Sequence, residues 1–172
     1  MTKPGLYGLT KYSKLGGLVR LRTPDPLVLE IGCRDGAGRE YMKLAPDRYW
    51  GLNSSEYYRA CTPGTLIARG AIGKGEYQDL PEDPFDAIIC HTEPLKGTPL
   101  LKRQHFDKIV WYTTELMSPD GLVIFWHVQN KKDYDERVFH KYFSEVSFFV
   151  CKFNHLTIIT VCSGPKEIAG GN

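Results

Sequence analysis

A histidine and a glutamate that could move protons stand close together in the middle of this chain. His91 and Glu93 lie in CHTEPL, residues 90–95, directly after an apolar run. Histidine can act as a general base near neutral pH, whereas glutamate can do so only if its pKa is raised. We therefore predict His91 and Glu93 as catalytic candidates. The alternative is that both are ordinary polar residues lining a loop.

A glycine-rich loop follows the first apolar run and could bind a ligand. The stretch VLEIGCRDGAG, residues 28–38, contains the carboxylate of Glu30 and then Gly32 and Gly36. Glycine permits a sharp turn and a close approach of the backbone to a ligand. The glycine spacing matches neither the dinucleotide fingerprint nor the P-loop, and Arg34 occupies the middle of the loop. A tight turn that binds nothing is the alternative.

Alternating strand and helix patterns must position these residues. Short apolar runs predict strands, and apolar residues at helical spacing predict helices between them. The expected strands are 27–31, 49–52, 65–68, 85–90, 122–128, 146–153 and 156–162, and the expected helices are 37–44, 54–61, 98–117 and 131–143. This order predicts a three-layer, Rossmann-like α/β fold with a mainly parallel seven-stranded sheet and a C-terminal antiparallel hairpin. In such sheets the ligand lies beyond the C-terminal ends of the strands.

Composition restricts the class of protein. The chain has 172 residues, 42% of them hydrophobic, and a formal charge of +2. No apolar stretch approaches the roughly 20 residues that span a bilayer, and the N-terminus has no secretory pattern, so we expect a cytoplasmic protein without a membrane partner. Five cysteines without CxxC spacing predict reduced, mostly buried thiols and no metal site.

The ordered set of motifs resembles that of the class I S-adenosylmethionine-dependent methyltransferases. The segments that carry the resemblance are LEIGCRDG (29–36), WGLNSSEYY (50–58), GEYQDLPEDPFDAIIC (75–90) and LMSPDGLVIFW (116–126). The resemblance runs from about Leu27 to Ser163. It implies a small methyltransferase-like domain over residues 27–163, preceded by a basic segment (1–26) and followed by a flexible tail (164–172).

The resemblance also implies S-adenosylmethionine as the cofactor and assigns residues to it. Glu30 would order the glycine loop and interact with the methionine amino end, while Asn53 would bind the ribose hydroxyls. Glu76 would face the adenine amino group beside Tyr77, with Asp79 as the competing choice. The complete implied set is Glu30, Gly32, Cys33, Arg34, Gly36, Asn53, Ser54, Glu76, Tyr77 and His91.

The methyl acceptor has no recognisable motif in the sequence. A basic rim would suit a phosphate-bearing acceptor such as nucleic acid, and the lack of a lid suggests a macromolecular substrate, a partner subunit or a homodimer. The candidate rim residues are Lys3, Lys11, Lys14, Arg20, Arg22, Lys96, Lys102, Arg103 and Lys108, with a solvated helix face as the alternative. The aromatic candidates for stacking are Tyr7, Tyr12, Trp50 and Trp126, of which the two tryptophans are more simply core residues of their strands. Two alternatives stay open: a non-catalytic binding or scaffolding subunit, and an oxidoreductase-type nucleotide-binding domain.

Overall fold

The fold of the chain was obtained as a computed structural model. It describes residues 6–33, 36–53, 66–71, 76–78, 80–91, 103–128, 136–150 and 157–167. These residues form an eight-stranded sheet in the order β4-β3-β2-β1-β5-β6-β8-β7. The strands are β1 (Val28–Ile31), β2 (Tyr49–Asn53), β3 (Leu66–Ala71), β4 (Glu76–Gln78), β5 (Phe85–His91), β6 (Met117–Val128), β7 (Phe143–Val150) and β8 (Thr157–Pro165).

The sheet is parallel at its centre and antiparallel at both ends. β3, β2, β1, β5 and β6 pair in parallel. β8 pairs antiparallel with β6 and with β7, and β4 pairs antiparallel with β3. The α/β Rossmann-like fold expected from the sequence is confirmed. The expected count of seven strands is wrong, because the glycine-rich stretch after β3 contributes β4.

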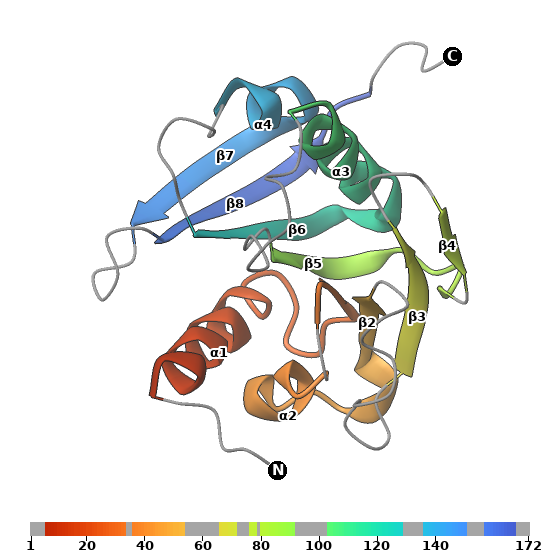
Figure 1. The fold of residues 1–172 in the computed structure, drawn as a ribbon, viewed down its shortest axis with the longest axis vertical. Helices are drawn as coiled ribbons and strands as arrows, with labels where there is room; N and C mark the ends of the chain where they lie inside the picture. The colour runs from red at the N-terminus through yellow and green to blue at the C-terminus, as the bar shows by residue number, and fades with distance from the viewer. Residues whose placement is uncertain are drawn as a thin grey trace.

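Helices cover both faces of this sheet (Figure 1). α1 (Leu6–Leu18) and α2 (Gly38–Met42) lie on one face, and α3 (Arg103–Leu116) and α4 (Glu136–Tyr142) lie on the other. A 3-10 turn over Pro46–Arg48 leads into β2. The helix expected over 54–61 and the first part of that expected from residue 98 lie outside the described residues.

Alternate residues of the central strands pack into two separate hydrophobic cores, one on each face of the sheet. Leu29 and Ile31 of β1 pack in the core beneath α3 and α4. Val28 packs in the core beneath α1 and α2. Successive side chains of a strand point to opposite faces, so Glu30 falls on the face covered by α1 and α2.

α1 was not expected from the sequence. Its segment contains Gly8, Gly16 and Gly17, which lower intrinsic helix propensity. Tertiary packing outweighs that cost, because Leu15 of the helix is fully buried in the same core as Val28. Arg20, which follows α1, donates to the carbonyls of Met42 (2.8 Å) and Lys43 (3.0 Å) at the end of α2.

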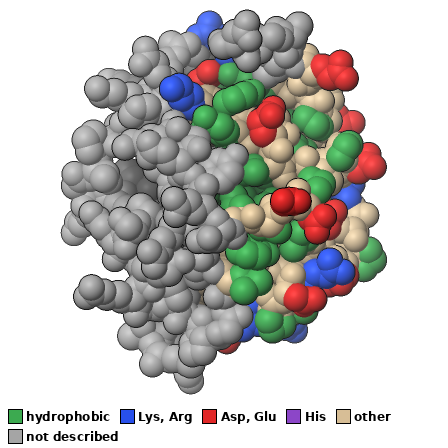
Figure 2. All heavy atoms as spheres, turned by 90° about the vertical axis from the view of Figure 1, so that its right-hand side faces the viewer, with side chains coloured by type: hydrophobic (Ala, Val, Ile, Leu, Met, Phe, Trp, Pro, Cys, Tyr) green, Lys and Arg blue, Asp and Glu red, His purple; other side chains and the backbone are tan. Residues whose placement is uncertain are grey.

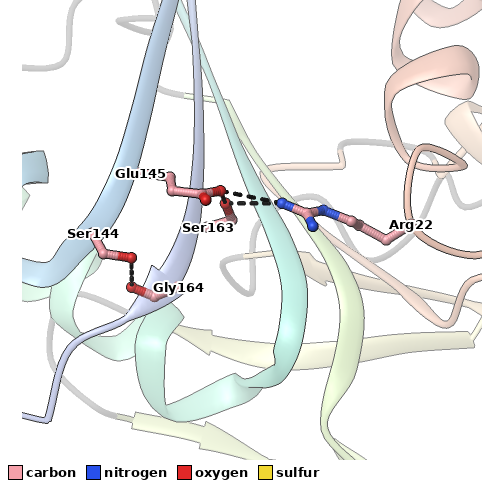
Figure 3. Close-up of polar contacts among 5 residues, drawn as sticks. All are labelled: Arg22, Ser144, Glu145, Ser163 and Gly164. Carbon is pink, nitrogen blue, oxygen red and sulfur yellow. Dashed lines mark hydrogen bonds and ion pairs between the residues drawn. The ribbon is translucent and has the colours of Figure 1, made fainter.

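Arg22, a few residues after the end of α1, bonds to β7 and β8 at one edge of the sheet (Figure 3). Arg22 donates to Glu145 Oε2 (3.2 Å) and to Ser163 Oγ (3.3 Å), and Ser163 Oγ donates to the same carboxylate oxygen (2.5 Å). Ser144 Oγ donates to the carbonyl of Gly164 (3.1 Å). These bonds connect the N-terminal segment to β7 and β8.

The residues Ser118–Gly121, between the helix expected over 98–117 and the strand expected over 122–128, lie within β6. Phe85 of β5 pairs with Met117 and Ala87 pairs with Leu122, so four residues of β6 face a single residue of β5. This irregularity lets turn-forming residues stay inside a strand. β7 begins at Phe143, three residues earlier than predicted, and α4 ends at Tyr142.

Candidate functional site

The candidate site lies at the C-terminal ends of β1, β2 and β5. β1 is flanked by β2, which follows it in sequence, and by β5 on its other side, so the strand order reverses at β1. Ile31, the last residue of β1, pairs with Leu52 and with Cys90. The next residues of the three strands, Gly32, Asn53 and His91, therefore meet at the sheet edge where ligands bind in open α/β folds.

The turn after β1 needs glycine at two positions. Gly32 has φ 77° and Gly36 has φ 72°, both in the left-handed region that other residues rarely adopt. The amide of Gly32 donates to the carbonyl of Leu52 (2.8 Å), which fixes the turn against β2. A Cβ at Gly32 would lie 3.5 Å from His91 Cβ, so Gly32, which is exposed, borders His91 directly.

Beneath this turn, Glu30 is the centre of a buried hydrogen-bond cluster. Its side chain is 0% exposed. Oε1 lies 2.5 Å from His91 Nε2 and accepts from Tyr12 Oη (3.1 Å), and Oε2 accepts from Tyr49 Oη (2.5 Å). The three partners come from β5, α1 and β2. The carboxylate thus joins three elements.

Electrostatics keep the Glu30 carboxylate ionised. Burial raises its pKa, but the hydrogen bond from His91, the charge of His91 when protonated and the hydrogen bond from Tyr49 outweigh burial. The net pKa of Glu30 lies below its ordinary value. Burial and the adjacent Glu30 charge raise the pKa of Tyr49 well above its usual range, so its hydroxyl stays a donor.

His91 has one ring nitrogen committed and one unpaired. Its side chain is 8% exposed, and Nε2 bonds to Glu30. Within the described residues, Nδ1 is buried and has no hydrogen-bond partner. A buried polar atom without a partner costs about 1–3 kcal/mol, so this nitrogen is a natural contact for a ligand.

The structure brings part of the predicted site together. Gly32, Cys33 and Gly36 form the turn, Asn53 ends β2, and His91 ends β5. The side chain of Cys33 is buried in the core, so only its backbone borders the turn. Glu76 and Tyr77 lie on β4, where Glu76 pairs with the last residue of β3. The side chains of Asn53, Glu76 and Tyr77, and the whole of Arg34, Ser54, Asp79 and Glu93, lie outside the described residues.

Two tyrosines take roles that the sequence did not indicate. Tyr12 was expected as a stacking residue at the mouth, but its hydroxyl donates to Glu30 and its ring stacks on Tyr41. Tyr49 was expected only as a strand residue. Both phenols lie near an acidic residue that is buried in a strand, and a buried carboxylate requires donors. Trp126, another stacking candidate, is buried in the core.

The charge expected at a basic rim is partly used inside the chain. Arg20 and Arg22 bond to groups of the chain itself. Figure 2 shows the face at the right-hand side of Figure 1, away from the C-terminal ends of β5 and β6, and there the described charged side chains are mostly acidic, with hydrophobic side chains between them. A phosphate-bearing acceptor stays a prediction.

The described cysteines lie inside the fold. Cys33, Cys90 and Cys162 are buried and form no disulfide. Burial raises the pKa of Cys90 to about 12, which leaves its thiol protonated at neutral pH.

Among the helices that the structure describes, none combines the length and apolar character needed to cross a membrane.

The fold of the chain is similar to that of solved methyltransferases. The N-methyltransferase NodS from Bradyrhizobium japonicum WM9 superposes with a TM-score of 0.68 at 19% identity, over 94% of this chain and 98% of NodS. NodS in complex with S-adenosylhomocysteine gives 0.67 at 18% identity, over 94% of this chain and 89% of that chain. A Plasmodium falciparum protein described as a ribosomal RNA methyltransferase gives 0.67 at 16% identity, over 92% and 96%. No protein-family model matches the sequence, and a comparison with curated proteins gives no match.

Proposed function

We propose that this chain is an S-adenosylmethionine-dependent methyltransferase. The observation that carries the proposal is the unpaired Nδ1 of His91, buried beside the glycine turn at the point where the strand order reverses. A turn that binds nothing does not need a buried polar atom at its edge. Structural similarity to methyltransferases supports the same proposal.

The described backbone fits the methionine end of the cofactor. Gly32 and Gly36 hold the turn in the left-handed region and have no side chain on it. Backbone of Gly32, Cys33 and Gly36 would contact the amino acid moiety. Asn53 at the end of β2 would bind the ribose, because an amide both donates to and accepts from hydroxyls. Glu76 and Tyr77 of β4 would lie at the adenine.

The chemistry then divides between the cofactor and the chain. S-adenosylmethionine supplies an activated methyl group on its sulfonium. The chain contributes proximity, in-line positioning and removal of a proton from the acceptor. His91, at the end of β5, would accept that proton. The acceptor is therefore a molecule with an N–H, O–H or S–H group.

Binding of S-adenosylhomocysteine to variants of the glycine turn tests this proposal. Gly32→Val places a β-branched residue at φ 77°, which costs about 1–3 kcal/mol or displaces the turn. We expect calorimetric affinity for S-adenosylhomocysteine to fall by about tenfold or more. Gly17→Val is the control, because a Cβ at Gly17 in α1 meets nothing within 4 Å.

The parent and Gly17→Val are expected to bind equally. A parent protein that does not bind S-adenosylhomocysteine would refute the proposed cofactor. Equal affinity of Gly32→Val and the parent would show that the turn after β1 is not the binding site.

A further inference from the structure

The contacts of Glu30 bear on which ring nitrogen of His91 carries the proton. Its Oε1 lies 2.5 Å from His91 Nε2, and the Tyr12 hydroxyl donates to the same oxygen at 3.1 Å. Its other oxygen accepts from the Tyr49 hydroxyl. A Cβ added at Gly38 would overlap Glu30 Oε2 and lie 2.7 Å from the ring of Tyr12. The carboxylate therefore cannot shift without breaking contacts on several sides.

An ionised carboxylate dictates where the imidazole proton lies. A carboxylate only accepts hydrogen bonds, so the nitrogen that faces it must be the donor. Nε2 of His91 therefore carries the proton. In a neutral imidazole the other nitrogen is then bare, and this is Nδ1, the atom without a partner among the described residues. The cluster thus selects one tautomer.

We propose that Glu30 is a positioning residue that holds His91 with its proton on Nε2, so that Nδ1 takes the proton released by the methyl acceptor. This inference rests on the proposed function. As the acceptor atom bonds to the methyl carbon, the bond from that carbon to the cofactor sulfur would break, with both bonding electrons staying on the sulfur. The bond from the acceptor atom to hydrogen would break as well, and the proton would form a new bond to Nδ1. The imidazolium that results faces the Glu30 carboxylate, and its Nδ1 proton afterwards passes to water.

The two tyrosines complete this arrangement. If the carboxylate were strongly basic, the Nε2 proton would move onto Glu30 and the imidazolium would not be stabilised as such. Hydrogen bonds from Tyr12 and Tyr49 stabilise the negative charge and so keep the proton on the ring. Because Tyr12 belongs to α1, the state of His91 is coupled to the docking of that helix.

A cluster in which Glu30 is neutral and only attaches α1 to the sheet makes a different prediction. A protonated carboxyl would donate to Nε2, so the imidazole proton would lie on Nδ1. A proton held between Nε2 and a buried carboxylate, in contrast, gives a far-downfield imidazole proton resonance that exchanges slowly with solvent. The test is therefore spectroscopic and does not depend on the unidentified acceptor.

Nuclear magnetic resonance of ¹⁵N-histidine-labelled protein provides the measurement. We expect a downfield proton bonded to Nε2, with an unprotonated Nδ1, in the parent and in Glu145→Gln. Glu145 is the matched control, since its carboxylate also accepts hydrogen bonds but lies on β7. The resonance should be absent from His91→Gln, which assigns it, and from Glu30→Gln.

Tyr12→Phe keeps the test decisive if Glu30→Gln does not fold. Removing the second donor to Oε1 strengthens the bond from Nε2, so the resonance should move further downfield. A proton on Nδ1 instead of Nε2, or a resonance that persists unchanged in Glu30→Gln, would overturn the proposal. Calorimetry of S-adenosylhomocysteine with the parent separates the two proposals. A proton on Nε2 without binding of S-adenosylhomocysteine would refute the proposed cofactor only. Binding of S-adenosylhomocysteine with the proton on Nδ1 would refute only the role of Glu30.

Discussion

The buried carboxylate of Glu30 makes the stability of the fold depend on pH. Its folded-state pKa is lowered, so ionised Glu30 contributes stability that is present above its unfolded pKa and is lost as pH falls through the folded value. The window of loss therefore lies below about 4.5. Each unit of difference between the two pKa values corresponds to about 1.4 kcal/mol.

Glu30→Gln should remove this pH-dependent contribution. We expect the variant to have a lower free energy of unfolding than the parent at pH 7, and this difference should narrow as the pH falls below 4. Urea unfolding of both proteins at pH 7 and below pH 4 measures the difference. Glu115→Gln, an exposed change on α3, serves as control and should cost less than about 0.5 kcal/mol. A gap that stays constant with pH would show that Glu30 is not ionised in the folded protein.

At the residue scale, the sequence predicted which strand ends meet but not the hydrogen bonds between their side chains. Glu30, Gly32 and His91 could be predicted to meet, because parallel strands bring their C-terminal ends to one edge. The positive φ of Gly32 was also expected from its place after a strand. Tyr12 and Tyr49 lie 18 and 19 residues from Glu30 in sequence, and their hydroxyls reach it only through tertiary packing. No local pattern encodes such a contact.

Among the elements, α2 is fitted to the cluster through a residue without a side chain. Gly38, the first residue of α2, faces the Glu30 carboxylate and the Tyr12 ring. Gly38→Ala would introduce a Cβ where Oε2 already lies. We expect a destabilisation of about 1–3 kcal/mol from overpacking, together with a perturbed His91 imidazole resonance. Urea unfolding and the histidine spectrum are the measurements.

Gly17→Ala is the matched change on α1. Nothing lies within 4 Å of a Cβ there, and alanine favours the helix, so the variant should be neutral or more stable by up to about 1 kcal/mol. If Gly38→Ala were equally well tolerated, the contacts around Glu30 would be looser than the geometry implies.

The elements that the sequence missed share a physical cause. The central strands and α3 have strong apolar patterns, and wherever the structure describes them they were predicted within a few residues, except that β6 begins five residues before the predicted strand 122–128. α1 is rich in glycine, and β4 has only three residues in a glycine-rich stretch. Their stability comes from packing and pairing with distant parts of the chain, which local propensity does not report.

At the scale of the whole molecule, the N-terminal segment is part of the domain core. Leu15 and Val19 are buried with Val28 and Trp126 on one face of the sheet. Arg20 bonds to the end of α2, and Arg22 bonds to β7 and β8. Pro24 and Pro26 lie between this segment and β1, but they do not separate it from the core. α1 should therefore unfold together with the sheet.

A pair of leucine variants tests this cooperativity. Leu15→Ala removes a fully buried side chain from the core under α1 and should cost about 2–5 kcal/mol. Leu21→Ala, three residues after α1 ends, removes a side chain that is 63% exposed and should cost less than about 0.5 kcal/mol. Far-ultraviolet circular dichroism and tryptophan fluorescence should report one coincident, shifted transition for Leu15→Ala. Leu15→Ala could instead leave the transition midpoint unchanged and cause only a loss of helical circular dichroism signal before the transition. That result would mean that α1 unfolds independently of the sheet. The orientation of His91 through Tyr12 would then be separable from the folding of the sheet.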